Sequence, residues 1–126
     1  MVMSGDKMAK STSSGTHKLV GEPISGVAFV QDYVEFHFDE KILRAFTPPV
    51  VTIDGMQHTF PNPGSRDALC SLIQRTVERL SVIDNERMEL GFSGGAVLEI
   101  PLAVSESIGP EAAHFVPGFN EPIEVW

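Results

Sequence analysis

The sequence contains a single cysteine, Cys70, and lacks any hydrophobic run long enough to cross a membrane. One cysteine cannot form an internal disulfide, and no second thiol or paired histidine lies near it in the sequence to complete a zinc site. A membrane-spanning helix needs roughly 18 or more consecutive apolar residues, which the chain does not have. We therefore expect a soluble protein of a reducing compartment, the cytoplasm, without membrane contacts and with Cys70 as a small structural hydrophobe.

Basic residues are absent from the last third of the chain, where six glutamates follow Arg87 and no lysine or arginine does. The formal net charge is −8, and from Glu22 onward six basic residues stand against sixteen acidic ones. A phosphate backbone is repelled by such a surface, and the basic stripe of nucleic-acid-binding proteins is missing. The charge argues against a nucleic-acid partner. It suits a basic protein partner, which a small acidic protein can neutralise as immunity-type proteins do.

The length of 126 residues and the 42% hydrophobic content suit one domain with its own core. Residues 1–20 carry lysines and a Ser/Thr/Gly run at 11–16 but no apolar stretch of the kind found in secretory signals. We therefore expect a disordered leader over residues 1–20 and a single β-rich domain over residues 21–126.

Two stretches of the domain have the two-residue period of β-strands. The first, residues 24–46, alternates most clearly at 33–38 (Y-V-E-F-H-F) and predicts a three-stranded meander. Pro48-Pro49 ends it, because proline donates no backbone hydrogen bond. Residues 50–53 and 56–60 flank Asp54-Gly55, a pair typical of a two-residue hairpin turn. The second stretch, residues 87–102 around Gly94-Gly95, predicts a hairpin, which forms another meander with the segment before the Asp84-Asn85 turn. Residues 123–125 predict a last short strand.

Between the meanders the pattern favours one short helix, around residues 66–74. Ser65 is placed to cap its N-terminus, Asp67 lies in its first turn, and Leu69, Leu72 and Ile73 share one face. The following residues, 74–82, fit a helical period as well as a strand. Their β-branched side chains favour the strand.

The two meanders also resemble each other. A shift of 54 positions places residues 34–38 over 88–92, and one further residue places 42–43 over 97–98. An internal duplication explains this similarity, and so does chance agreement between two amphipathic hairpins. The predicted fold is mainly β, of the α+β type, with two antiparallel meanders and one short helix. A small barrel or an Sm-like sandwich accommodates these elements.

The chain lacks the short sequence motifs that are typical of cofactor-binding sites and of activated nucleophiles. It contains no G-x-G-x-x-G, Walker, G-x-S-x-G or H-E-x-x-H pattern, so we predict no cofactor and no metal site. One spacing is suggestive: on a helical turn after Pro110, Glu111 and His114 would share one face. With His58 they are the candidate catalytic groups. The alternative is a capped turn whose histidine is half buried.

Large apolar residues gather in the last dozen positions. Phe115, Phe119 and Trp126 are the candidate interface residues, with Ile123 and Val125 beside them. Small β domains cover unpaired strand edges by self-association, which would use such a tail. The alternative, that these side chains complete the core of the monomer, has equal weight.

A resemblance rests on Leu90 to Leu98 (L-G-F-S-G-G-A-V-L) and on the following Gly109-Pro110-Glu111-Ala112. Over these residues the chain resembles small β-rich bacterial and phage proteins without an assigned function, and the resemblance implies no site residue. A helix followed by a bent meander is also similar in outline to Sm-like small barrels. That similarity implies an RNA-binding ring, against which the acidic charge argues.

Three functional hypotheses follow from the sequence. The first is a non-enzymatic, homo-oligomeric binding or interaction module of a bacterium or phage. The second is a small metal-dependent or hydrolytic enzyme that uses Glu111 and His114. The third is an Sm-like RNA-binding ring protein.

Overall fold

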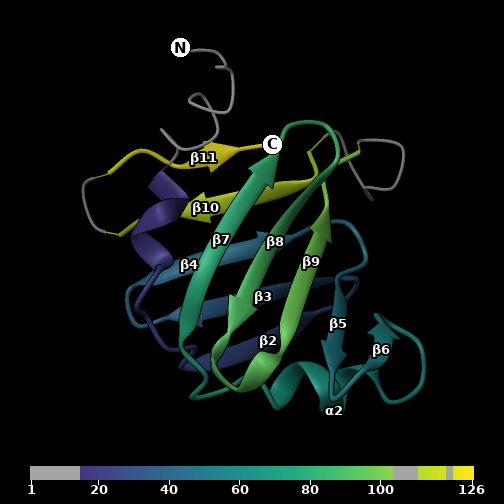
Figure 1. Ribbon diagram of the computed structural model, residues 1–126. Coiled ribbons are helices and arrows are strands. Elements are labelled where there is room, and N and C mark those ends of the chain that lie inside the picture. Colours follow the sequence, from purple (N-terminus) through teal and green to yellow (C-terminus); the bar gives the residue numbers. More distant parts are fainter. Residues whose placement is uncertain (1–14, 104–110, 119–120) are drawn as a thin grey trace.

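The computed structural model describes residues 15–103, 111–118 and 121–126, which form two five-stranded antiparallel β-sheets. The first sheet has the order β11-β10-β4-β3-β2, and the second has the order β6-β5-β9-β8-β7. Figure 1 shows the two sheets one behind the other, with their strands crossing steeply as in orthogonal β-sandwiches. No closed barrel forms within the described residues, and the two sheets pack face to face as a sandwich.

The strands follow the predicted segments closely. The first sheet contains β2 (Gly26–Val30), β3 (Tyr33–Phe38), β4 (Lys41–Ala45), β10 (Ala113–Val116) and β11 (Glu124–Val125). The second contains β5 (Val50–Ile53), β6 (Met56–Thr59), β7 (Val77–Ile83), β8 (Arg87–Phe92) and β9 (Val97–Pro101). The helical elements are η1 (Gly15–Leu19), α2 (Ser65–Cys70) and η2 (Ser93–Gly95).

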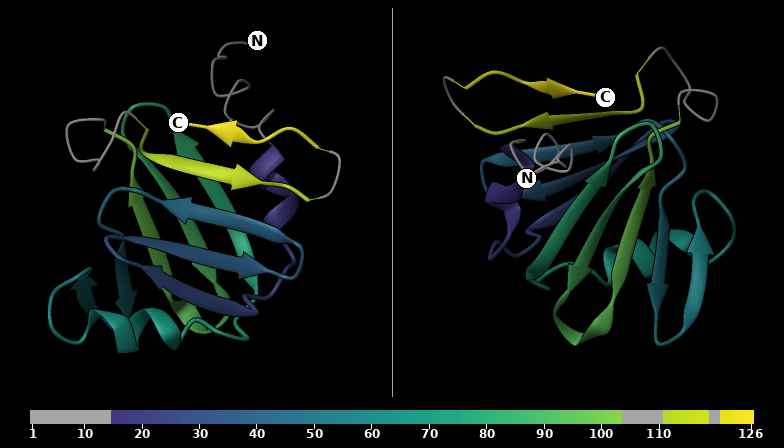
Figure 2. Two further views of the ribbon diagram at one scale, coloured as in Figure 1. Left: turned by 180° about the vertical axis from the view of Figure 1, so that it is seen from behind. Right: turned by 45° about the horizontal axis from the view of Figure 1, so that its top comes forward.

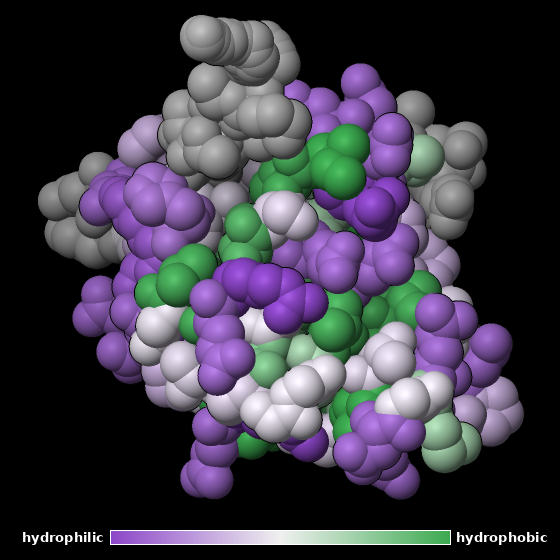
Figure 3. All heavy atoms as spheres, viewed as in Figure 1, coloured by the Kyte–Doolittle hydropathy of each residue, from purple (hydrophilic) through white to green (hydrophobic). Residues whose placement is uncertain are grey.

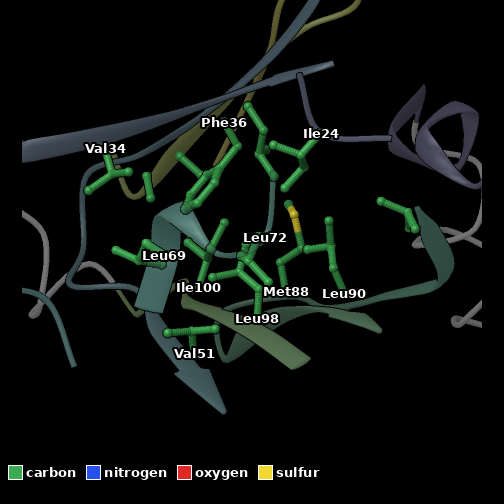
Figure 4. Packing of buried hydrophobic residues seen from close by; sticks show 14 of the residues in the cluster. Ile24, Val34, Phe36, Val51, Leu69, Leu72, Met88, Leu90, Leu98 and Ile100 are labelled. Carbon is green, nitrogen blue, oxygen red and sulfur yellow. The ribbon is translucent and has the colours of Figure 1, made fainter. Parts of the chain in front are cut away.

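Alternation of side chains along each strand separates the core from the surface. In β3, Val34, Phe36 and Phe38 are fully buried, whereas the residues between them face outward and are half-buried. Side chains from both sheets meet in one cluster, and Figure 4 shows Phe36 of the first sheet in the same core as Met88, Leu98 and Ile100 of the second. Burial of a side chain of this size contributes about 1.5–3 kcal/mol, so this cluster is the main source of stability.

The two halves of the chain have the same topology. The first half, β2 to β6, is a three-stranded meander followed by a hairpin, and so is the second half, β7 to β11. Each hairpin leaves its own meander and pairs with the meander of the other half, because β5 lies beside β9 and β10 lies beside β4. Exchanging the two halves therefore reproduces both sheets with the same strand order.

Cross-strand partners agree with this equivalence residue by residue. Phe36 pairs with Leu43 in the first sheet, and Leu90 pairs with Leu98 in the second. Equivalent residues of the two halves are 54 positions apart in the middle strands, β3 and β8, and 55 positions apart in the following strands, β4 and β9. The extra residue lies in the Ser93–Gly95 turn, which replaces the two-residue turn after Phe38. Two unrelated meanders would not need to pair with each other's hairpins in the same way. The topology therefore favours an internal duplication.

The helix is shorter than the predicted span of 66–74, since α2 ends at Cys70. The cause is tertiary: Gln74 has a φ of 78°, and its N–H donates to the carbonyl of Ile24. The predicted N-cap is also displaced. Gly64, with a φ of 86°, occupies that position, and Ser65 is buried. The strand interpretation of the ambiguous segment is correct, because it leads into β7.

Two further expectations differ from the structure. The predicted helical turn after Pro110 is instead the start of β10, which pairs with β4 over four residues. The leader was expected to extend to residue 20, but Gly15–Leu19 forms a 3-10 turn and Leu19 is fully buried. The packed part of the chain therefore includes residues before position 21, and residues 1–14 lie outside the described residues.

Candidate functional site

A pocket of about 300 Å³ opens near the turn between β2 and β3. Three separate segments build it: the β2–β3 turn, the connection from β4 to β5, and the connection from β6 into α2. Its lining residues are Gln31, Asp32, Phe46, Pro48, Phe60, Pro61 and Arg66. Apolar walls with a few polar groups are typical of sites that bind small molecules, and this volume is at the lower end of their range.

Arg66 lies over a pair of stacked phenylalanine rings beside this pocket. The ring centroids of Phe29 and Phe60 are 5.8 Å apart with an interplanar angle of 13°. The guanidinium carbon of Arg66 is 5.0 Å from the centroid of Phe60 and 5.7 Å from that of Phe29. Within the described residues this guanidinium makes no hydrogen bond or ion pair. The two rings orient a cation that is free to bind a ligand.

Phe46 forms another wall and connects the pocket to the candidate catalytic residues. Its ring centroid is 5.0 Å from that of Tyr33 and 4.7 Å from that of His114, against which it packs edge to face. His114 Nε2 is hydrogen-bonded to Glu111 Oε1 at 2.5 Å. The structure therefore brings Glu111 and His114 together, but not through the predicted helical turn: His114 belongs to β10, and Glu111 lies just before this strand.

Next to this group, Glu35 is the centre of a polar network on the outer face of the first sheet. Its carboxylate accepts a hydrogen bond from Arg44 Nε at 2.9 Å and is 3.0 Å from His37 Nε2. Partial burial raises the pKa of Glu35, but the hydrogen bonds and charges of Arg44 and His37 outweigh it, so the pKa is lowered. These groups satisfy one another, which indicates a structural role.

Because the two sheets have the same topology, equivalent positions on their outer faces can be compared. A residue type that the fold itself requires should occur in both sheets. Glu35 of β3 corresponds to Glu89 of β8, so both sheets have a glutamate at that place. The pocket-side residues have no such counterparts: at the positions equivalent to Tyr33, Phe46 and His114, the second sheet has Arg87, Pro101 and Val50. The aromatic and imidazole groups are therefore particular to the first sheet and are not demanded by the architecture.

The third candidate catalytic residue, His58, lies apart from the other two. It belongs to β6 at the edge of the second sheet and lines a separate open depression of about 430 Å³ with residues of α2. Glu111 and His114 lie on and beside β10, in the first sheet. Among the described residues, no three histidine, cysteine, aspartate or glutamate side chains come close enough to hold a metal ion.

The candidate interface residues have different environments. Phe115 is fully buried in the core, opposite Leu43, so its side chain is not accessible to a partner. Trp126 is half-buried against the core, and its backbone N–H donates to the carbonyl of Ala113. Phe119 lies outside the described residues. The exposed apolar residues of this tail are Ile123 and Val125, which are 52% and 50% exposed.

The outer side of the second sheet shows no comparable aromatic group. In the space-filling view of Figure 3, hydrophobic residues on this face form small separate patches among hydrophilic ones. Its side chains include Glu89, which is 3.9 Å from Arg79 and 3.8 Å from Arg87. The first sheet and its pocket are therefore the better candidate site.

Comparison with known proteins found no matching family model, no matching curated protein and no matching solved structure. Within the described residues, no helix is both long and apolar enough to span a membrane. Sequence reasoning missed Phe29, Phe60 and Arg66 as site residues. They come from segments with no common spacing, and only the tertiary structure places them together.

Proposed function

We propose that this protein is a non-enzymatic binding module and that the pocket beside Phe46 and Arg66 is its recognition site. The observation that carries the proposal is the Arg66 guanidinium, which is stacked on two rings beside an apolar pocket and lacks a counter-ion among the described residues. Aromatic residues and arginine are the side chains enriched where proteins bind their partners. The difference between the two sheets supports the assignment, because the fold does not require these groups.

A set of small aromatic probes tests the pocket. The probes are 3-phenylpropanol, 3-phenylpropanoate, phenethylamine and L-phenylalanine, which are neutral, anionic, cationic and zwitterionic. In two-dimensional amide NMR spectra, at least one probe is expected to shift the signals of Gln31, Asp32 and Arg66. A Phe46→Ala variant with an otherwise native spectrum should lose these shifts, because it removes one wall. The proposal fails if none of the four probes shifts these signals.

The second part of the proposal is that the module is a homo-oligomer that pairs through β11. This strand ends the first sheet, as the rear view in Figure 2 shows, and Val125 is half exposed there with Ile123 close by. An edge strand has unpaired backbone groups on its free side, and a second copy related by a two-fold axis can satisfy them. The β7 edge is less suited, because its first residue, Val77, already exchanges hydrogen bonds with Gly21 and Glu22.

Light scattering of the purified protein tests this pairing. The wild-type protein is expected to have the mass of a dimer, and Val125→Lys should convert it to a monomer by placing a charge at the paired edge. Val20→Lys is the matched control, because Val20 is also a half-exposed valine, 46% exposed, but lies outside any strand. A monomeric wild-type protein at its highest soluble concentration would refute this part.

A hydrolytic activity is the second candidate function, favoured by the contact between His114 and Glu111. A carboxylate that orients an imidazole is the usual arrangement of a general base. Within the described residues no hydroxyl or thiol is hydrogen-bonded to His114, so water would be the nucleophile. Hydrolysis of p-nitrophenyl acetate that His114→Ala abolishes would support this candidate; equal rates for both proteins would exclude it for this ester.

A further inference from the structure

Two opposite charges line the pocket without pairing with each other. Asp32 belongs to the β2–β3 turn, and Arg66 belongs to the first turn of α2. Within the described residues, neither the carboxylate nor the guanidinium makes a hydrogen bond or an ion pair. Charges of opposite sign that share a small pocket but do not neutralise each other are available to a ligand that carries both signs.

The structure fixes the backbone of the turn that carries Asp32 and the side chain of Arg66. Asp32 follows Gln31 in a two-residue turn that is closed by the pairing of Val30 with Tyr33, and Gln31 has a φ of 54°. Arg66 is oriented by its stacking on Phe29 and Phe60. A binding site gains affinity when its groups are already ordered, because less conformational entropy is lost on binding.

The remaining walls are apolar and of limited extent. Phe46, Pro48, Phe60 and Pro61 supply them, around a volume of about 300 Å³. This volume suits a ligand of about a dozen non-hydrogen atoms with one ring or branched chain. The backbone of an internal peptide stretch carries neither an ammonium nor a carboxylate group, so it supplies no partner for either charge.

We propose that the pocket binds a free α-amino acid with an aromatic or other large apolar side chain. The carboxylate of the amino acid pairs with the Arg66 guanidinium, its ammonium group pairs with Asp32, and its side chain packs against Phe46 and Phe60. A ligand with one charge can pair with only one of Asp32 and Arg66, so it lacks one of the two charge-assisted contacts that a zwitterion makes. This inference rests on the proposed function, since it names the ligand class of the same pocket.

Calorimetric titration with the four probes named above tests the ligand class, because three of them are L-phenylalanine with one or both charges removed. L-Phenylalanine is expected to bind about tenfold or more tightly than 3-phenylpropanoate, phenethylamine and 3-phenylpropanol. Asp32→Asn should abolish its advantage over 3-phenylpropanoate. Arg66→Gln should abolish its advantage over phenethylamine, and Phe46→Ala should weaken the binding of all four.

The outcomes separate this inference from the proposed function. If 3-phenylpropanoate or phenethylamine binds as tightly as L-phenylalanine, the pocket binds ligands but does not select a zwitterion, and the inference alone is overturned. The same holds if the neutral alcohol binds best. If none of the four binds, both the inference and the proposed recognition site fail. Asp32 and Arg66 are exposed, so amide spectra of both variants should show the native fold.

Discussion

Truncation of two equivalent core leucines tests whether the two halves of the molecule are energetically alike. Leu43 and Leu98 are both fully buried and occupy the same place in the third strand of their meanders. Each is flanked by the middle strand of its own meander and by the hairpin of the other half. Leu43 lies between Phe36 and Phe115, and Leu98 lies between Leu90 and Val51.

The expected magnitude follows from the burial of both side chains. Replacement of a fully buried leucine by alanine costs about 2.7–5.0 kcal/mol, and the cost grows with the cavity that remains. We expect about 3 kcal/mol or more for each variant. The loss of unfolding free energy should be slightly larger for Leu43→Ala than for Leu98→Ala. The two phenylalanine rings beside Leu43 are rigid and fill the cavity less readily than the leucine and valine beside Leu98.

Urea denaturation at pH 7 measures this loss, and unchanged m-values would show that only stability differs. Val20→Ala serves as the surface control, with an expected change below about 0.5 kcal/mol. A difference above about 2 kcal/mol between the two leucine variants, with equal m-values, would refute the energetic equivalence of the two halves. Losses below about 1 kcal/mol for both would contradict their place in the core.

Two further predictions concern a surface network and a turn. Because Arg44 and His37 lower the pKa of Glu35, its ionised form stabilises the fold above the pKa of an ordinary glutamate, and this contribution is lost as pH falls through the lowered pKa. Glu35→Gln should therefore reduce the unfolding free energy by about 1–2 kcal/mol at pH 7. In acid the difference in unfolding free energy from wild type should vanish. A difference that does not change with pH would contradict this prediction. Gly55→Ala should cost about 1–2 kcal/mol in urea denaturation, because Gly55 has a φ of 80° although nothing lies within 4 Å of the added methyl group. Gly26→Ala, which has space and no positive φ, should cost less, and equal losses would show that strain at Gly55 is not the cause.

Local pattern was sufficient to predict most strands and turns. The alternation in β3 and the Asp54-Gly55 turn depend only on neighbouring residues, and both are present in the structure as predicted. The repeat was visible for the same reason, since equivalent strands bury the same positions. The end of the helix was not predictable from local pattern, because the contact between Gln74 and Ile24 joins residues that are far apart in the chain.

The sequence by itself therefore determined the class of the fold, a domain of two antiparallel meanders and one short helix, through side-chain periodicity and turn chemistry. Only the tertiary structure decided that each hairpin pairs with the opposite meander, because any exposed strand edge offers the same backbone groups. The pocket, too, is formed only by the tertiary structure. Asp32, Phe46 and Arg66 stand in three separate segments, and their meeting depends on how the two sheets and α2 pack together.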